Sequence, residues 1–346
     1  MGNSEWPLVS IVIPCRNEER FIGRCLDSLM ESDYPMDRIE IIVVDGMSTD
    51  GTRQVLDRYA GICPALTVLE NPGGQTPVGL NIGIRRAQGA CVVILSSHAS
   101  IDRSYLSKAV SAVSNCIADC VGGIMTTIPG GESWTSRSIA LALSCVFGVG
   151  NAHFRTGAIA PRFVDTVPFG CYRRGVFDEI GLFHEGLTRN QDIEFNLRLR
   201  RAGGKILLAP DIISHYHARP TLKGLFVQNF WNGYWVLYSM RFAPLPFSWR
   251  HLVPLCFVTA LMGSALLALG SGPGLLPLAL TLGLYAMGNA AFSIATAVRT
   301  DLRHLPFLAV SFIALHVSYG IGSLWGLLRL MTAGLGRGIR VAKETA

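Results

Sequence analysis

A single carboxylate, Asp192, stands where the sequence could place a general base. It follows Arg189-Asn190-Gln191 and opens a run from Ile193 to Ala202 in which apolar residues recur at helical spacing, until Gly203-Gly204. The partial positive charge of a helix N-terminus stabilises an ionised carboxylate. We therefore expect Asp192 to be deprotonated at neutral pH, as a residue that removes a proton must be. The alternative is that Asp192 only caps its helix.

Residues 9–95 predict the frame that would position such a site. Short apolar runs at 9–13, 39–44, 66–69 and 91–95 indicate buried strands, and the amphipathic stretches between them indicate helices. This alternation is typical of a parallel α/β sheet with right-handed crossovers. Ligands bind beyond the carboxyl ends of such strands. The polar residues expected to converge there are Arg16-Asn17-Glu18, Asp45 and Ser96-Ser97-His98.

The composition is too apolar for an ordinary soluble enzyme. The sequence is 50% hydrophobic and 16% charged, and its mean hydropathy is +0.37. No Asp, Glu, Lys or Arg occurs from Leu252 to Val298, a length that suffices for two membrane spans of about 20 residues each. The glycine-rich residues 270–274 would form the turn between them. With the uncharged stretch after His304, we predict transmembrane helices at 252–270, 275–298 and 305–328 rather than a buried helical hairpin.

The segments beside these helices are aromatic or basic. Residues 221–250 mix many aromatic rings with three basic residues, which predicts an amphipathic segment in the membrane interface, the alternative being an ordinary core helix. Residues 331–346 form a basic tail. The net charge of +6 fits a surface held against anionic membrane lipids, and no nucleic-acid-binding motif is present. We expect residues 1–220 to be the cytosolic domain of a multi-pass protein of the cell inner membrane.

The last apolar segment leaves one question of topology open. With the first domain inside, the loop at Arg299 and Arg303 also returns inside, as the positive-inside rule prefers. A third full crossing would then place Arg337, Arg340 and Lys343 outside. Either this segment is re-entrant, or the rule is overridden here.

Two motifs at the predicted crevice carry a family resemblance: IVIPCRNEE at residues 11–19 and VVDGMSTDGT at residues 43–52. They resemble the first strand with its nucleotide loop, and the second signature, of the family 2 glycosyltransferases. Residues 71–73, 79–84, 147–150 and 165–170 are similar to an ExoA-like membrane branch that assembles exopolysaccharides of the succinoglycan type. Over residues 8–238, the resemblance implies a GT-A fold, which is a Rossmann-like nucleotide-sugar-binding domain, followed by C-terminal transmembrane helices.

The resemblance implies a nucleotide-sugar donor, with Glu18 and Asp45 in contact with the uridine of a UDP-sugar. A carboxylate at a strand end can accept hydrogen bonds from the uracil N–H or from ribose hydroxyls. The alternative for Asp45 is a turn former that bonds its own backbone. The expected donor-binding residues are Pro14, Arg16, Glu18, Asp45, Asn81 and Ser96.

The acidic metal motif of the family is degenerate in this chain. Ser96 stands where the ExoA-like pattern would have Asp, and Ser is a weak ligand for a divalent cation. His98 remains as the expected metal ligand, and imidazole suits Mn²⁺ better than Mg²⁺. His215 or His217 would be a further ligand or a packing residue. An enzyme that needs little or no metal is the alternative.

By the same resemblance, Asp192 matches the family's catalytic base and would deprotonate an acceptor hydroxyl during inverting transfer. Glu194 is expected to pair with Arg198 on the next helical turn. The expected acceptor is a lipid-linked saccharide of cell-surface polysaccharide assembly. One alternative is a polyprenyl-phosphate glycosyltransferase, and another is a non-catalytic membrane scaffold that has kept the fold. The residues expected on the acceptor side are Phe169, Gly170, Gln191 and Trp235.

Overall fold

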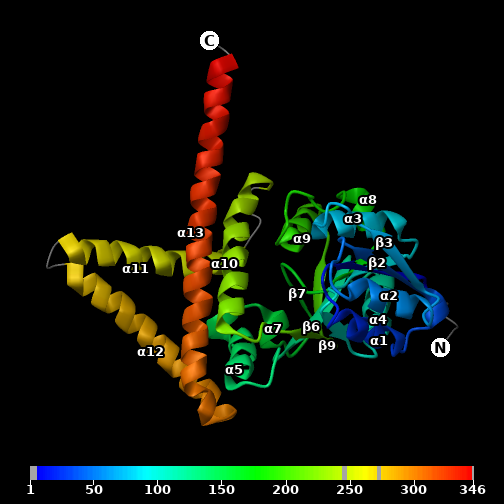
Figure 1. Cartoon of the computed structure of the whole chain (residues 1–346), viewed down its shortest axis with the longest axis horizontal. Coiled ribbons are helices and arrows are strands. Elements are labelled where there is room, and N and C mark those ends of the chain that lie inside the picture. The colour runs from blue at the N-terminus through cyan, green and yellow to red at the C-terminus, as the bar shows by residue number, and fades with distance from the viewer. Residues whose placement is uncertain (1–5, 244–247, 271–273, 345–346) are drawn as a thin grey trace. The chain divides into compact units, whose positions relative to one another are not determined.

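The computed structural model describes residues 6–243, 248–270 and 274–344, with side chains up to Thr332 (Figure 1). The chain divides into two compact units, one of residues up to Thr126 with His153–His217, the other of Thr127–Ala152 with the residues from Ala218 onward. The expected turn at 270–274 lies partly outside the described residues.

The first unit is built on a nine-stranded sheet in the order β3-β2-β1-β4-β8-β6-β9-β5, with β7 paired to β9. Short apolar runs form its strands, as the sequence predicted for the first four. The strands are β1 (Val9–Cys15), β2 (Ile39–Asp45), β3 (Leu66–Glu70), β4 (Cys91–Ile94), β5 (Ala99–Ile101), β6 (Cys120–Ile128), β7 (Arg162–Phe163), β8 (Cys171–Arg173) and β9 (Ile206–His217).

Only half of this sheet is parallel. Strands β3, β2, β1 and β4 pair in parallel, because the helices α1 (Ile22–Met30), α2 (Thr52–Ala60) and α3 (Thr76–Arg86) return the chain to the same end. In contrast, β8 pairs antiparallel with β4, and β5 and β7 pair antiparallel with β9. The prediction of a parallel sheet is therefore confirmed for the four strands that it covered, and the later antiparallel strands had not been predicted.

Helices cover both faces of the sheet, as Figure 1 shows. Alternate residues of the central strands point to opposite faces, so Ile11 and Ile41 join one core cluster while Val12 and Ile42 join the other. Helices α1, α2 and α4 (Tyr105–Ser114) contribute to the first cluster, and α3, α8 (Gly175–Glu179) and α9 (Gln191–Arg201) to the second. The short helix α7 (His153–Thr156) completes the helices of this unit.

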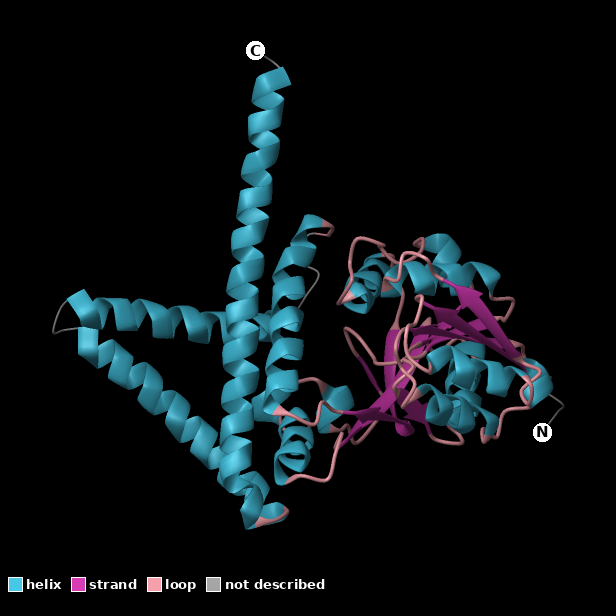
Figure 2. Ribbon diagram, in the orientation of Figure 1, coloured by secondary structure: helices cyan, strands magenta, loops and turns pink. Residues whose placement is uncertain are grey.

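The described part of the second unit is mainly helical (Figure 2). Three helices are long and apolar enough to cross a membrane, in the segments Trp249–Leu269, Leu275–Arg299 and Leu302–Thr332. Their positions match the three apolar segments predicted from the sequence. The helices of the unit are α5 (Trp134–Leu143), α6 (Val146–Val149), α10 (Leu222–Tyr238), α11 (Val253–Gly270), α12 (Leu275–Arg299) and α13 (Leu305–Glu344).

Helices α10 and α13 lie side by side with their backbones in contact. Gly322 and Gly326, one turn apart on α13, face the backbones of Phe230 and Tyr234, and a Cβ on Gly326 would come within 2.4 Å of the Tyr234 carbonyl oxygen. Small residues allow such close approach between helices in membranes. Helix α10 is the first part of residues 221–250, the segment predicted to lie in the membrane interface. It packs on α13, and its position in a membrane stays a prediction. Because α13 continues unbroken to Glu344, it contains no reversal of the kind a re-entrant segment requires.

Candidate active site

Hydrogen bonds join the loops that follow β1 and β2. Cys15 lies opposite Asp45 in the parallel register, so the next residues of both strands emerge side by side. Asn17 adopts a left-handed conformation with φ 56°, and its side-chain oxygen accepts from the Thr49 backbone N–H at 2.8 Å. The Glu18 N–H donates to the Thr52 hydroxyl at 2.8 Å. The two sequence motifs therefore form one structural element, and this locking role of Asn17 and Thr52 had not been predicted.

Asp45 holds the turn that follows β2. The Ser48 hydroxyl donates to its carboxylate at 2.6 Å, and Arg53 lies 3.5 Å away. Only 1% of Asp45 is exposed. The Ser48 backbone N–H also donates to the Asp45 carboxylate at 3.3 Å, which is the contact of the turn former considered as the alternative above. A contact with the donor stays a prediction.

Glu18, Ser96 and His98 lie together beside this element. His98 Nδ1 is 3.2 Å from the Glu18 carboxylate and 3.2 Å from the Ser96 hydroxyl. Among the described residues, no three His, Cys, Asp or Glu side chains are grouped to hold a metal ion. Divalent cations at diphosphate sites often take only one or two protein ligands and complete their shell with phosphate oxygens and water. The pair of His98 and Glu18 fits a cation of this kind.

The histidines of β9 are engaged elsewhere. His215 Nε2 lies 2.7 Å from the Asp102 carboxylate. The ring of His217 contacts Phe21, with 5.6 Å between centroids, and burial, followed by the charge of Arg24, lowers the pKa of His217. His215 thus has a polar partner and His217 an aromatic packing contact, and within the part of the chain that the structure describes neither joins His98 in a metal-binding group.

Three other expected donor-binding residues have different surroundings. Arg16 is exposed and its guanidinium lies 3.5 Å from the Gly74 carbonyl oxygen, while Pro14 is half-buried within β1. The Asn81 amide donates to the Phe183 carbonyl at 2.9 Å and to Glu185 at 3.0 Å, and it accepts from the Phe183 N–H at 3.0 Å. Asn81 thus ties α3 to the loop before α9, and its contact with a donor stays a prediction.

The segment that precedes β8 lies beside the carboxyl end of β4. The Gly170 carbonyl accepts from the Ile94 N–H at 3.0 Å, two residues before Ser96. A Cβ on Gly170 would lie 2.7 Å from the Cys120 sulfur, so glycine allows this close approach. Phe169 has a φ of 50°, and its carbonyl accepts from the Tyr105 hydroxyl at 2.6 Å. Phe169 and Gly170 are therefore held next to the end of β4, close in sequence to Ser96.

A buried hydrogen-bond network connects residues 166–172, at the start of β8, to α9. The Tyr172 hydroxyl donates to Asn196 at 2.9 Å, and the Asn196 amide donates to the Thr166 hydroxyl at 2.9 Å. Asn196 lies one turn after Asp192, so these bonds fix the start of the helix. Glu194 pairs with Arg198 at 2.7 Å, as predicted.

Asp192 is the second residue of α9, after Gln191, and the left-handed Asn190 occupies the N-cap position. Burial raises the pKa of Asp192, although hydrogen bonds from the backbone N–H groups of Ile193 and of Asp192 itself lower it. The residue is nonetheless solvent-exposed, so one side stays open while surrounding protein atoms disfavour the charge. The backbone N–H groups at the helix start favour the charged form, as expected, but burial has the larger effect on the pKa. Deprotonation of Asp192 at neutral pH stays a prediction. A carboxylate with a raised pKa is a stronger base.

Trp235 lies in α10, in the second unit, whereas the other residues expected on the acceptor side belong to the first unit. Its ring contacts those of Tyr234 and Tyr238, each with 5.5 Å between centroids. The structure therefore places Phe169, Gly170 and Gln191 in the unit that contains Asp192, and its described parts do not test a role for Trp235.

Residues 10–181 match the family model described as Glycosyl transferase family 2. The chain belongs to this glycosyltransferase family. The succinoglycan biosynthesis protein ExoA of Rhizobium meliloti is 26% identical over 315 residues, which cover 90% of this chain and 92% of ExoA. A dolichyl N-acetyl-α-D-glucosaminyl phosphate 3-β-D-2,3-diacetamido-2,3-dideoxy-β-D-glucuronosyltransferase of Methanococcus voltae is 28% identical, over 64% of this chain and 70% of that protein. This glycosyltransferase therefore takes part in glycan biosynthesis.

A solved structure supports the fold. The mannosyltransferase of Pyrobaculum calidifontis, in complex with GDP-mannose and Mn²⁺, superposes with a TM-score of 0.61 at 22% identity, covering 93% of this chain and 88% of its own. The glycosyltransferase thus has the predicted GT-A α/β fold with apolar C-terminal helices.

Proposed function

We propose that this glycosyltransferase moves a sugar from a UDP-sugar to a lipid-linked saccharide, with inversion at the anomeric carbon. The observation that carries the proposal is Asp192, a carboxylate with a raised pKa at the start of a helix fixed by the Asn196 network. The lipid-linked acceptor is supported by three helices able to cross a membrane. The names of the relatives from R. meliloti and M. voltae also support it, since they specify succinoglycan biosynthesis and a dolichyl-phosphate-linked sugar.

In this mechanism, Asp192 takes the proton of an acceptor hydroxyl while the hydroxyl oxygen attacks the anomeric carbon. The bond from that carbon to the diphosphate breaks at the same time, and the nucleoside diphosphate leaves with the bonding electrons from the opposite face. An α-linked donor therefore gives a β-linked product. His98 and Glu18 would hold a divalent cation, which when bound offsets negative charge on the diphosphate. The exposed guanidinium of Arg16 would add a second positive charge near the crevice.

The test is release of UDP by the full chain purified in detergent, with UDP-glucose, a membrane lipid extract and either Mn²⁺ or EDTA. Release that requires lipid and disappears in Asp192→Asn is expected. Asp57→Asn, which changes an exposed carboxylate of α2, is the matched control and should keep full activity. Other nucleotide-sugars, including GDP-mannose, form the donor panel. Equal activity of wild type and Asp192→Asn would disprove the role of Asp192.

Analysis of the lipid product separates the acceptor classes. A sugar joined to a saccharide already on the lipid supports the proposal, whereas a sugar joined directly to the lipid phosphate indicates a polyprenyl-phosphate glycosyltransferase. Loss of transfer in EDTA, with recovery in Mn²⁺, would support the cation at His98 and Glu18. Full activity in EDTA would instead favour the metal-independent alternative.

A further inference from the structure

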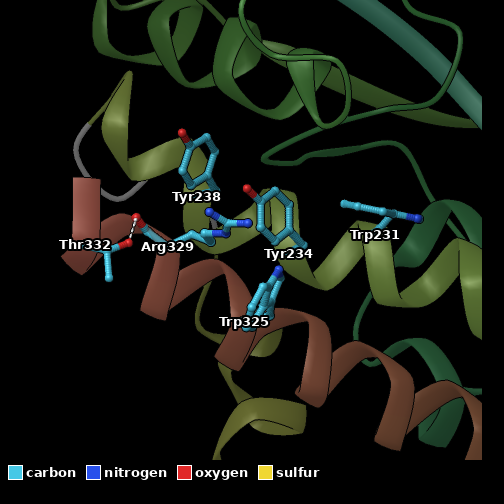
Figure 3. Close-up of a pocket in the computed structure, with 6 residues that line it drawn as sticks. All are labelled: Trp231, Tyr234, Tyr238, Trp325, Arg329 and Thr332. Carbon is cyan, nitrogen blue, oxygen red and sulfur yellow. Dashed lines mark hydrogen bonds between the residues drawn. The ribbon is translucent and has the colours of Figure 1, made fainter. Parts of the chain in front are cut away.

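A pocket opens between α10 and α13 in the second unit (Figure 3). Its volume is about 350 Å³, within the range of about 300–1,000 Å³ that is usual for small-molecule sites. Helix α10 contributes aromatic rings, and α13 contributes one ring, a guanidinium and a hydroxyl. The lining residues are Trp231, Tyr234, Tyr238, Trp325, Arg329 and Thr332.

The lining rings of α10 contact one another, and the aromatic residues of the pocket are partly exposed. Tyr234 stacks on Tyr238, with 5.2 Å between ring centroids, and Trp231 contacts Tyr234 edge to face at 5.5 Å. Trp231 is 40% exposed and Trp325 is 45% exposed. The pocket lies where the uncharged stretch from His304 to Leu328 ends, at Arg329. Exposed Trp and Tyr at such a position are typical of the boundary between lipid tails and headgroups.

The charge in this pocket is positive. Arg329 lies over the Trp325 ring at 5.2 Å, and in Figure 3 its side chain extends from α13 toward Tyr234 and Tyr238. Arg241, which is not a lining residue, donates from its guanidinium to the hydroxyl of the lining residue Tyr238 at 3.0 Å. Guanidinium groups with nearby hydroxyls are well suited to bind a phosphate.

No carboxylate neutralises Arg329 among the described residues. From Ile212 to Lys343 the sequence contains a single acidic residue, Asp301, and it pairs with Arg303 at 2.8 Å. Within the described part of the second unit, the other carboxylate, Glu132, pairs with Arg137 at 2.8 Å. Arg329 therefore offers its charge to an anion that comes from outside the chain.

We propose that this pocket binds the phosphate group of a membrane lipid, with the start of the lipid chain lying against its aromatic rings. A free phosphate would leave the exposed parts of the Trp231 and Trp325 rings uncovered, and a cationic ligand would be repelled by Arg329. A lipid that carries a phosphate can pair its phosphate with Arg329 and pack its apolar chain against the rings of Trp231 and Trp325. The identification of this lipid as the sugar acceptor rests on the function proposed above. The existence of a lipid-phosphate site does not depend on that function.

The test is lipid binding by the full chain in detergent, measured by native mass spectrometry without any sugar donor. The ligands are an isoprenyl monophosphate, the corresponding isoprenyl alcohol, phosphatidylglycerol and inorganic phosphate. We expect the isoprenyl phosphate to bind, and Arg329→Gln to weaken it about tenfold because one charge-assisted hydrogen bond is lost. Arg329→Lys, which keeps the charge, should retain most of the affinity. Arg299→Gln is the matched control, because Arg299 is an exposed arginine of the same unit outside the pocket.

The source of the phosphate follows from the order of affinities. Tighter binding of the isoprenyl phosphate than of phosphatidylglycerol supports an acceptor-type lipid, and the reverse order supports an ordinary anionic phospholipid. A photoactivatable isoprenyl phosphate should also label residues 325–332 of the wild type, a result that needs no variant to fold. The proposal is overturned if the alcohol binds as tightly as the phosphate, if inorganic phosphate competes equally well, or if Arg299→Gln loses as much affinity as Arg329→Gln.

This experiment can fail independently of the proposed function. Asp192→Asn should still bind the lipid phosphate although it transfers no sugar. If the wild type transfers sugar to a lipid acceptor and Arg329→Gln binds the isoprenyl phosphate as tightly as the wild type, only the lipid-phosphate site at Arg329 is disproved.

Discussion

The two units of this glycosyltransferase hold their functional residues in different ways. In the candidate active site of the first unit, side chains such as Asp45 and Asn196 are buried and held by hydrogen bonds. In the second unit, α10 and α13 touch through glycines, and Arg329 has no carboxylate partner among the described residues. The first arrangement suits groups that must stay fixed during a reaction. The arrangement in the second unit leaves the charge of Arg329 available to a ligand. The position of this charge relative to the rings of α10 then depends on the distance between α10 and α13.

Replacing Asp192 with Asn should give the largest effect. We expect sugar transfer to fall by about 10²–10⁴-fold, the usual contribution of a general base. Because burial raises the pKa of Asp192, activity of the wild type should fall as pH decreases through a value above the ordinary range of Asp. Initial rates measured across pH in detergent test both points. If the rate instead falls at a pH equal to the usual pKa of Asp, a group other than Asp192 limits the rate at low pH.

The same pKa shift predicts that the loss is not caused by unfolding. A carboxyl group whose pKa is raised in the folded state stabilises that state while protonated, and this contribution is lost as pH rises through the folded pKa. At neutral pH, Asp192→Asn should therefore unfold at the same temperature as the wild type, or at a higher one. A lower unfolding temperature would indicate a structural role for Asp192.

The glycine contacts of the second unit can be disrupted by a single methyl group. A Cβ on Gly322 would lie 1.9 Å from the Phe230 carbonyl oxygen, so Gly322→Ala must separate α10 from α13, at a cost of about 3 kcal/mol. Gly263→Ala is the control, because a Cβ there has no neighbour within 4 Å. Thermal unfolding measures both variants. If the two behave alike, close backbone contact does not hold these helices together.

The hydrogen-bond network of the first unit should be slightly less sensitive. Asn196→Ala removes the partner of the buried Tyr172 and Thr166 hydroxyls, which should lower the free energy of unfolding by about 2 kcal/mol. We also expect kcat to fall because α9 carries Asp192, while KM for the donor stays the same. Asn115→Ala, which changes an exposed amide bonded to Ser111, should leave both quantities unchanged. If Asn196→Ala changes only the KM for the donor and not kcat, Asn196 acts in nucleotide-sugar binding rather than in positioning Asp192.

The turn after β2 should show the smallest effect. Ser48→Ala removes the hydroxyl that donates to Asp45 at 2.6 Å, and one such bond contributes about 1 kcal/mol to stability. If this turn helps to bind the donor, KM for the nucleotide-sugar should rise a few-fold while kcat changes little. Ser107→Ala, at an exposed hydroxyl bonded to Asp33, is the control. An unchanged KM would limit Asp45 to its turn-forming role.

The sequence predicted those parts of the molecule that depend on local patterns. Strands β1 to β4, the helices between them and the three apolar helices follow from residue periodicity, and Asp192 was placed near the start of its helix. Among the antiparallel strands, β8 has three residues and β7 has two, too few for a period to be read, whereas β6 and β9 are longer and were also not predicted. Strands of this kind are specified by their neighbours in the sheet.

The electrostatic properties of the candidate site could not be predicted in the same way. The raised pKa of Asp192 and the burial of Asp45 depend on segments that are distant in sequence. The Arg329 pocket also needs α10 and α13, about ninety residues apart in the chain, to meet. The family motifs predicted that the loops after β1 and β2 converge, but not that Asn17 and Thr52 lock them together.

The distribution of cysteines gives this protein a natural reporter of its orientation. All nine thiols are free, and only two of them, Cys116 and Cys256, are exposed. Cys116 follows α4 in the first unit, whereas Cys256 lies within the first candidate membrane span. A membrane-impermeant maleimide added to intact cells would label Cys116 only if the first unit faces outward, and lipid would shield Cys256. Labelling before and after cell lysis can therefore show which side of the membrane the first unit occupies, without any engineered residue.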